Sequence, residues 1–390
     1  MKQKILMVHN YYQIGGGEHT VFHNETELLR SHGHEVVEYT RSNAELKTSK
    51  LKLLLSPLST LWSVKTYREV RRLIRKHQID VVHCHNTFPL ISPSVYAAAH
   101  SLKVPVIQTI HNFRLVCPCG VFYNKGQICE KCLHNGLLEA LKNKCYRSSF
   151  VQTLIVTAML KLHRLLGTYR KIQYIFLTRF NRDKIGPALG LNDQQMFIKP
   201  NFAFEMDVSR HAEDYSKGKY FFVGRLDAFK GINFLVDMWK SHDFGTLYIY
   251  GSGEMEEYVK NAADGKRIVY RGFISKDDIY QECADAEAML FSSEVYEGFP
   301  MTIVESLSCG IPVISTDIGN GGSIIQDGVN GYKYHHGSEE SFAHALQNVR
   351  KEGAALRQKT YHNYQTYFTA EANYQTLSEI YQKSGETNAR

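Results

Sequence analysis

The chain has 390 residues, more than one ordinary hydrophobic core holds, so two domains are expected. It contains no run of eighteen uncharged apolar residues, and its first four residues lead directly into an apolar run, so we expect neither a membrane-spanning helix nor a signal peptide, and predict a cytoplasmic protein. The net charge of +7 is unevenly divided: residues 1–199 hold 28 Lys and Arg against 12 Asp and Glu, or +16, and residues 200–390 hold 18 against 27, or −9. The basic half predicts an anionic partner, such as the inner face of the plasma membrane or a lipid diphosphate, with solvated charge as the alternative. No nucleic acid partner is expected.

Short apolar runs alternate with helical segments along the chain. Strands are expected at 5–8, 36–40, 81–83, 106–109 and 174–177 in the first half, and at 220–223, 246–250, 268–271, 288–291 and 313–315 in the second. This alternation predicts an α/β protein with two doubly wound, Rossmann-like domains, each built on a parallel sheet covered on both faces. Because Pro200 weakens helix formation before it, the linker is placed at 199–201, and the domains span 1–199 and 200–368. Apolar residues at helical spacing predict a final helix in 369–390.

A glycine loop follows the first expected strand. Gly15, Gly16 and Gly17 permit close backbone approach, and a helix that begins near Glu18 would present its N-terminus to an anion. A dinucleotide-binding fingerprint does not fit, because Thr20 stands where its third glycine belongs. The loop therefore predicts an anion contact, with a plain tight turn as the alternative.

A histidine follows the expected strand at 106–109. His111 lies where open α/β sheets place their ligands, at the carboxyl end of a strand. His83 and His85 end the preceding strand and are weaker candidates of the same kind.

Cations and glycines follow the strands of the second half. Arg225 and Lys230 come shortly after the strand at 220–223, where a planar guanidinium and a mobile ammonium can flank a diphosphate. A surface turn is the alternative for either cation alone. The further candidates after this strand and the next two are Gly224, Gly251, Gly253 and Phe273.

The segment 297–305 carries two carboxylates. Pro300 suits the first turn of a helix, so Glu297 is expected in the preceding loop and Glu305 about one turn inside. The first backbone N–H groups of this helix lack intrahelical partners and form an anion site that fits a diphosphate. One carboxylate can then reach a sugar and the other a ribose, with solvated acids on an ordinary helix as the alternative. The residues expected beside the phosphates are Gly298, Phe299, Pro300, Met301 and Thr302.

The Glu-x7-Glu pair within Glu-Gly-Phe-Pro, together with Gly-Arg-Leu and Lys-Gly upstream, resembles the retaining nucleotide-sugar glycosyltransferases of family four, which have the GT-B fold. The resemblance implies that Arg225 and Lys230 neutralise the donor phosphates. It also implies that Glu297 holds sugar hydroxyls, that Glu305 holds the ribose, and that His111 meets the transferred sugar or the acceptor. The catalytic group expected from it is therefore His111, Arg225, Lys230 and Glu297.

The same resemblance extends over nearly the whole chain. It implies that the loop at Gly16 and Gly17 touches the donor phosphate and the acceptor. It further implies that Gly251 and Gly253 face the nucleotide, that the segment before Phe273 reads the base, and that the final helix packs back on the first domain.

The expected function is retaining transfer of a hexosyl or related unit from a nucleoside diphosphate sugar, with UDP favoured, to a hydroxyl of a glycan or lipid-linked acceptor. Bacterial surface polysaccharide synthesis is the expected setting. No cofactor is required for catalysis, because side-chain cations and a helix N-terminus can stabilise the departing diphosphate. The alternatives are a nucleotide-sugar epimerase of the same shape, which needs no acceptor, and a catalytically silent nucleotide-sugar-binding partner of a larger enzyme.

Five of the eight cysteines lie between residues 117 and 145. Cys129 and Cys132 have the Cys-x-x-Cys spacing of a zinc ligand pair, and Cys117 with Cys145 would complete a structural tetrathiolate site. Unlinked thiols are the alternative, because no second Cys-x-x-Cys occurs. This segment resembles a cysteine-bearing insert in a bacterial subset of family four.

Two further segments predict helices with a choice of surroundings. The basic stretch 65–76 would contact an anionic membrane surface, or would be a helix with solvated charges. The apolar stretch 150–167 would lie in a membrane interface, or would be a helix packed between the two expected domains.

Overall fold

The computed structural model describes residues 2–13, 16–47, 57–206 and 215–389, with the side chains of 386–389 left out. Gly15 of the glycine loop lies outside the described residues. The chain divides into two compact units. Unit 1 consists of Met1–Asn124, Cys129–Pro200 and Tyr374–Arg390, and unit 2 of Lys125–Ile128 and Asn201–Asn373.

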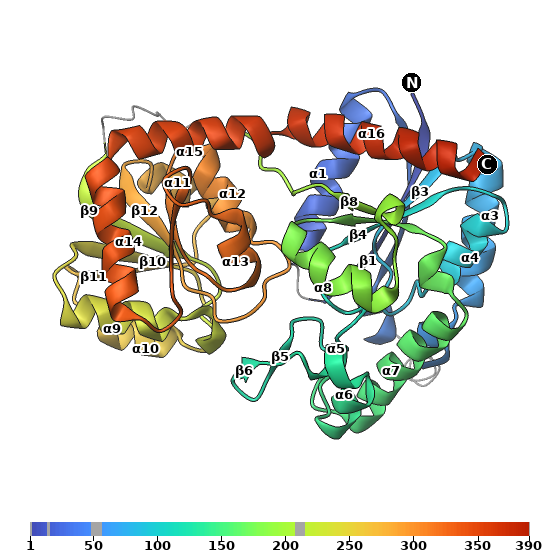
Figure 1. Cartoon of the computed structure of the whole chain (residues 1–390), viewed down its shortest axis with the longest axis horizontal. Coiled ribbons are helices and arrows are strands. Elements are labelled where there is room, and N and C mark those ends of the chain that lie inside the picture. The colour runs from blue at the N-terminus through green and yellow to red at the C-terminus, as the bar shows by residue number, and fades with distance from the viewer. Residues whose placement is uncertain (1, 14–15, 48–56, 207–214, 390) are drawn as a thin grey trace. The chain divides into compact units, whose positions relative to one another are not determined.

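Unit 1 contains a six-stranded parallel sheet in the order β2-β1-β3-β4-β7-β8 (Figure 1). Its strands are β1 (Lys4–Tyr11), β2 (Glu35–Ser42), β3 (Val81–Asn86), β4 (Val106–Ile110), β7 (Gln173–Phe176) and β8 (Met196–Ile198). Every pairing between neighbours is parallel. The central strands β1, β3 and β4 are buried along nearly their whole length, because helices cover both faces of such a sheet.

The helices of unit 1 connect these strands. They are α1 (Gly17–Ser31), α3 (Val64–His77), α4 (Ser94–His100), α5 (Lys131–Asn135), α6 (Leu138–Lys142), α7 (Phe150–Leu165) and α8 (Arg179–Leu189). A two-stranded hairpin precedes α5; its first strand, β5 (Tyr123–Asn124), belongs to unit 1, and its second, β6 (Gln127–Ile128), lies in the segment assigned to unit 2. Single 3₁₀ turns occur at Asn43–Lys47, Thr168–Arg170 and Asp193–Gln195.

The last helix, α16 (Ala370–Ala389), packs on unit 1 through most of its length. Leu377, Ile380 and Tyr381 join a buried cluster that includes Phe22 of α1 and Met7 of β1, and Figure 1 shows α16 in red beside α1. Burial of these apolar side chains, at about 25 cal/mol per Å², holds the helix on the sheet.

Unit 2 repeats the architecture with the strand order β11-β10-β9-β12-β13-β14 (Figure 1). Its strands are β9 (Ser216–Val223), β10 (Thr246–Tyr250), β11 (Ile268–Gly272), β12 (Ala286–Phe291), β13 (Val313–Thr316) and β14 (Gly331–Tyr334). Its helices are α9 (Ile232–Ser241), α10 (Glu256–Ala262), α11 (Lys276–Glu282), α12 (Met301–Ser308), α13 (Gly319–Ile324), α14 (Glu339–Glu352) and α15 (Ala354–Tyr367), with a 3₁₀ turn at Ala228–Lys230. Two buried apolar clusters fill the opposite faces of the sheet.

The predicted fold class is confirmed, and each of the ten expected strands is present. Four strands of the described residues were missed: β5 and β6 of the short hairpin, and β8 and β14, which both lie at an edge of a six-stranded sheet. β8 has only three residues, and β14 begins at Gly331 and contains the half-buried Lys333, so neither shows the longer apolar run of a central strand.

The structure differs from the predicted helices in two details. Pro300 is the N-cap residue of α12 and not part of its first turn, and α7 ends at Leu165. Within the described residues, none of the helices combines the length and apolar character that crossing a membrane demands.

Candidate functional site

The carboxyl ends of the unit 2 strands gather cations and carboxylates. Lys230, in the 3₁₀ turn after β9, donates from Nζ to Oε1 of Glu297 and forms an ion pair with it. Ser293 Oγ donates to the same oxygen over 2.8 Å. The side chains of Lys230 and Glu297 are only 18% and 20% exposed, so the ammonium is held in one place rather than moving freely. The structure thus joins two residues that lie 67 positions apart in the sequence.

A glycine fixes the position of Lys230. Gly231 has φ of +70°, and a Cβ built on it would lie 2.1 Å from the carbonyl oxygen of Ser292. Only glycine fits such a left-handed conformation against a backbone atom without rearrangement. Ser292 Oγ also donates to the carbonyl oxygen of Lys230 over 2.7 Å, so the turn is anchored to the end of β12.

Arg225 lies on the open side of this region. Its side chain is 66% exposed, and Nη1 lies 2.9 Å from Asp227 Oδ2. Both the Arg225 guanidinium and the Lys230 ammonium lie 5.8 Å from the centre of the Phe229 ring. The two predicted cations therefore lie close together and each pairs with a carboxylate, but Lys230 is mostly buried and Arg225 is mostly exposed to solvent.

Helix α12 adds an N-terminus and the second carboxylate. Its N-cap residue, Pro300, has no side-chain acceptor, so the N–H groups of the first turn remain able to bind an anion. Asn320 Nδ2 donates to the carbonyl oxygens of Glu297 and Gly298 over 2.5 and 2.7 Å and shapes the preceding loop. Glu305 is 12% exposed, with Lys276 Nζ 3.6 Å away, and burial raises the pKa of its carboxyl group.

Two glycine segments run against each other in the same region. The N–H of Gly224 donates to the carbonyl oxygen of Tyr250 over 3.1 Å, and that of Leu226 donates to Ser252 over 2.9 Å. Gly251 has φ of +130°, and a Cβ on it would lie 1.9 Å from the Gly224 carbonyl oxygen. The turn therefore requires a glycine at 251 for backbone packing. Phe273, after β11, is 83% exposed.

Unit 1 places His111 directly after β4. His111 Nε2 lies 3.0 Å from Nδ1 of His85, the ring of which stacks on it. Gly16 is the N-cap of α1 in extended conformation, and a Cβ on it would meet no atom within 4 Å. Packing within the protein therefore does not require glycine at this position.

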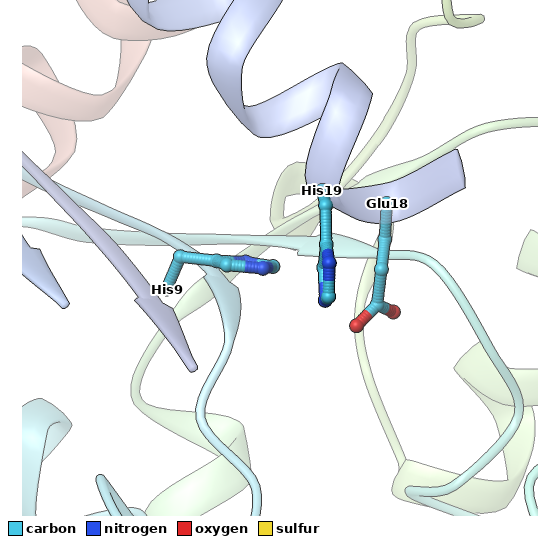
Figure 2. A group of neighbouring side chains, drawn as sticks. All are labelled: His9, Glu18 and His19. Carbon is cyan, nitrogen blue, oxygen red and sulfur yellow. The ribbon is translucent and has the colours of Figure 1, made fainter. Parts of the chain in front are cut away.

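Figure 2 shows a cluster that the sequence analysis missed, formed by His9 at the end of β1 and by Glu18 and His19 in the first turn of α1. One ligand atom of each residue lies within 4.8 Å of the others. His9 is fully buried, stacks on Phe22, and has no hydrogen-bond partner for either ring nitrogen among the described residues. Burial lowers the pKa of His9 to about 3, and that of Glu18 rises to about 7 for the same reason.

The donors around this cluster argue against a metal ion. The N–H of Tyr12 donates to His19 Nε2 over 3.1 Å, so that lone pair is occupied. Asn86 Nδ2 donates to Glu18 Oε1 over 3.0 Å. An imidazole that accepts at Nε2 carries its proton on Nδ1 and has no second lone pair for a cation. The cluster is therefore a group of one buried and two half-buried polar side chains, and only the position of Glu18 after the glycines hinted at it.

The predicted zinc site is not supported. Among the described residues, no three of Cys117, Cys129, Cys132 and Cys145 bring their sulfur atoms within 4.8 Å of one another. The close pair is instead formed with Cys119, whose Sγ lies 3.3 Å from that of Cys117. The Cys-x-x-Cys spacing brings two potential zinc ligands together along the chain, but only the tertiary fold can bring a second pair to them. In this fold the sulfur of Cys117 lies against that of Cys119 instead.

Two family models match the chain. Residues 217–352 match the model described as Glycosyl transferases group 1, and residues 14–143 match Glycosyltransferase Family 4. An uncharacterised glycosyltransferase of Methanocaldococcus jannaschii is 23% identical over 81% of this chain and 78% of its own length. The lipopolysaccharide 1,6-galactosyltransferase of Salmonella typhimurium is 31% identical over 33% of this chain and 39% of its own length.

Solved structures share the fold over nearly the full chain. A lipopolysaccharide outer core galactosyltransferase in its apo form superposes with a TM-score of 0.64 at 18% identity, covering 97% of this chain and 98% of that one. An Anabaena protein in complex with UDP gives 0.65 at 15% identity, covering 96% and 98%. Sucrose-phosphate synthase of Thermosynechococcus elongatus gives 0.67 at 15% identity, covering 99% and 100%. The matched models and the two parallel-sheet units together show that the chain belongs to the family-four-like glycosyltransferases of GT-B fold.

Proposed function

We propose that the chain is a retaining glycosyltransferase that moves a sugar from a nucleoside diphosphate sugar, UDP-linked by preference, to a hydroxyl of a glycan or lipid-linked acceptor. The observation that carries the proposal is the Lys230–Glu297 ion pair beside the N-terminus of α12. It places a held cation next to a carboxylate at the carboxyl end of a parallel sheet, where α/β proteins bind nucleotides.

The roles follow from charge. Departure of a diphosphate from the anomeric carbon develops negative charge, which Lys230, Arg225 and the first N–H groups of α12 would stabilise without reorganisation. Glu297 would accept hydrogen bonds from sugar hydroxyls and Glu305 from the ribose. Because Lys230 and Arg225 can stabilise the charge of the departing diphosphate, we assign no catalytic step to a divalent metal. The nucleotide would bind residues 200–368 and the acceptor residues 1–199.

Two observations on relatives support the donor and the setting. One fold neighbour, the Anabaena protein, has been solved in complex with UDP and also in complex with UDP-glucose. Two relatives that match about a third of this chain are named lipopolysaccharide 1,6-galactosyltransferases. The retaining outcome rests on the resemblance of the 297–305 segment to family four.

The test is product analysis with a panel of UDP-sugars and hydroxyl acceptors. We expect acceptor-dependent release of UDP and, by NMR of the anomeric proton, a product with the donor's anomeric configuration. Conversion of the donor without acceptor would identify an epimerase instead. Donor binding with no turnover on any acceptor would identify a silent binding partner.

We further propose that unit 1 meets an anionic membrane surface, at the inner face of the plasma membrane. The support is a surface on which Trp62 contacts both Tyr67 of α3 and His163 of α7. Helix α7 exposes Phe150, Val151, Leu154, Leu162 and Leu165. A row of cations on α3 lines an adjoining groove: Arg68, Arg71, Arg72, Arg75 and Lys76.

Apolar insertion and cationic attraction together are what peripheral binding needs. Vesicle flotation tests this: we expect recovery with anionic vesicles, weakened by salt. Substituting Arg71, Arg72 and Arg75 with Gln should reduce it. Equal recovery with neutral vesicles, or no effect of salt, would refute the proposal.

A further inference from the structure

A buried carboxylate in unit 1 has one oxygen without a donor. Glu25 of α1 is fully buried, and its Oε2 accepts from Nζ of Lys199, also fully buried, over 3.0 Å. Its Oε1 has no hydrogen-bond partner among the described residues. A buried, unsatisfied carboxylate oxygen is costly, so a neighbouring N–H is expected to point at it.

Two histidines of β3 face this oxygen. His83 Nδ1 lies 3.6 Å from it, but both ring nitrogens of His83 already pair with hydroxyls, Tyr381 Oη and Thr109 Oγ1, at 2.7 Å each. His85 Nε2 lies 3.9 Å from it and has no hydrogen-bond partner among the described residues. Of the two histidines near Glu25 Oε1, His85 is therefore the one whose nearer nitrogen has no other partner in the part of the chain that the structure describes.

His85 in turn contacts His111, the histidine of unit 1 that was predicted to meet the sugar or the acceptor. His85 Nδ1 and His111 Nε2 are 3.0 Å apart, so one of them donates and the other accepts. Burial lowers the pKa of both rings well below the usual value, with His83, His9 and Lys199 adding to the effect. Both imidazoles are therefore neutral near pH 7, and each has one N–H and one lone pair.

Electrostatics selects one of the two tautomer arrangements. If His85 donated from Nδ1, its Nε2 lone pair would face the carboxylate Oε1 in a buried site, which is repulsive. If His85 carries its proton on Nε2, it donates toward Glu25 and accepts at Nδ1. His111 must then donate from Nε2, which leaves its Nδ1 with a lone pair.

We propose that Glu25, acting through His85, holds His111 as the tautomer protonated on Nε2, so that Nδ1 accepts a hydrogen bond from a substrate hydroxyl. Glu25 and His85 are positioning residues, and Lys199 balances the charge of the carboxylate. His111 in this form binds a hydroxyl and does not donate to a phosphate oxygen from Nδ1. The tautomer is a property of the free protein, and only the identity of the hydroxyl rests on the proposed function.

The sharpest perturbation is Glu25→Gln. Lys199 is a donor and would take the amide oxygen, which turns the NH₂ group toward His85 Nε2. His85 must then accept there and donate from Nδ1, and His111 must accept at Nε2 and carry its proton on Nδ1. The substitution therefore reverses the tautomer of His111 while preserving shape. The matched control is Tyr381→Phe, which removes a hydroxyl from the His83 branch of the same buried network.

The measurement is long-range ¹H–¹⁵N NMR of protein labelled at histidine nitrogens, with His111 assigned by the signal lost in His111→Gln. We expect protonated Nε2 and unprotonated Nδ1 in the wild type and in Tyr381→Phe, and the reverse in Glu25→Gln. In turnover assays Glu25→Gln should lower kcat at least about 10-fold with an unchanged donor KM, since a wrong histidine tautomer cost about 10⁴-fold in a serine protease.

The outcomes separate this proposal from the proposed function. A wild-type His111 protonated on Nδ1, or equal changes in Glu25→Gln and Tyr381→Phe, would overturn it. Absence of turnover in the wild type would count against the proposed function and leave the NMR result standing. If Glu25→Gln does not fold, His85→Phe replaces it, with mixed His111 tautomers as the expected result and a single unchanged tautomer as the refuting one.

Discussion

Replacing Lys230 with Ala tests the proposed donor site most directly. The side chain is 18% exposed, and its ammonium pairs with Glu297, which is 20% exposed. Loss of one preorganised donor to developing charge costs about 10²–10³ in kcat, or about 3–4 kcal/mol. The stability cost should be smaller, between the ~0–1 kcal/mol of an exposed ion pair and the ~3–5 kcal/mol of a buried one. Glu297 keeps its bond from Ser293, which preserves the loop.

The assay is steady-state UDP release at saturating donor, with thermal unfolding to confirm the fold. Lys219→Ala is the matched control, because Lys219 also forms an ion pair in unit 2, with Asp285, and its side chain is 21% exposed. It should lower the melting temperature without a large effect on kcat. Wild-type turnover in a folded Lys230→Ala protein, or an equal loss in Lys219→Ala, would contradict the assigned role.

Three further predictions follow from individual residues. Gly231→Ala should destabilise the protein by at least ~1–2 kcal/mol, because φ is +70° and Ser292 blocks the methyl group. Gly16→Ala, at the extended and open N-cap of α1, should cost only about 0.5 kcal/mol, the preference of an N-cap for glycine over alanine; equal effects would refute the steric argument. The raised pKa of Glu18, about 7 against the usual 4.5, means that the folded state binds this proton more tightly, so stability falls as pH rises from 4.5 to 7. Glu18→Gln should therefore be more stable than the wild type above pH 7, by at most ~3 kcal/mol, with no difference below pH 4.5, as denaturant titrations at several pH values would reveal. Glu305→Gln should weaken UDP binding about 10-fold in calorimetry, because a charge-assisted hydrogen bond to the ribose is lost. Binding of 2′,3′-dideoxy-UDP, which lacks the ribose hydroxyls, should not change. Similar weakening for both nucleotides would show that Glu305 does not bind the ribose.

Local sequence patterns determined the fold class. Each expected strand, from 5–8 to 313–315, is a short apolar run between helical segments, and such runs are visible in sequence because a parallel strand is buried on both faces. β8 is apolar but has only three residues, and β14 reads Gly-Tyr-Lys-Tyr, so neither has the longer apolar run by which the other strands were recognised. The Glu297–Glu305 spacing was likewise readable, because Pro300 marks where α12 begins.

Tertiary structure alone decided which side chains meet. Lys199 reaches Glu25 across 174 positions and His83 reaches Tyr381 across 298, and no local periodicity records such pairings. The same limit explains the zinc prediction, since spacing along the chain placed Cys129 near Cys132 but could not bring Cys117 and Cys145 to them. Neighbouring residues determine the local conformation, so the sequence reveals it. A polar group that is buried away from water needs a hydrogen-bond partner, and that partner can come from any part of the chain. Which residue it is depends on how distant strands and helices pack.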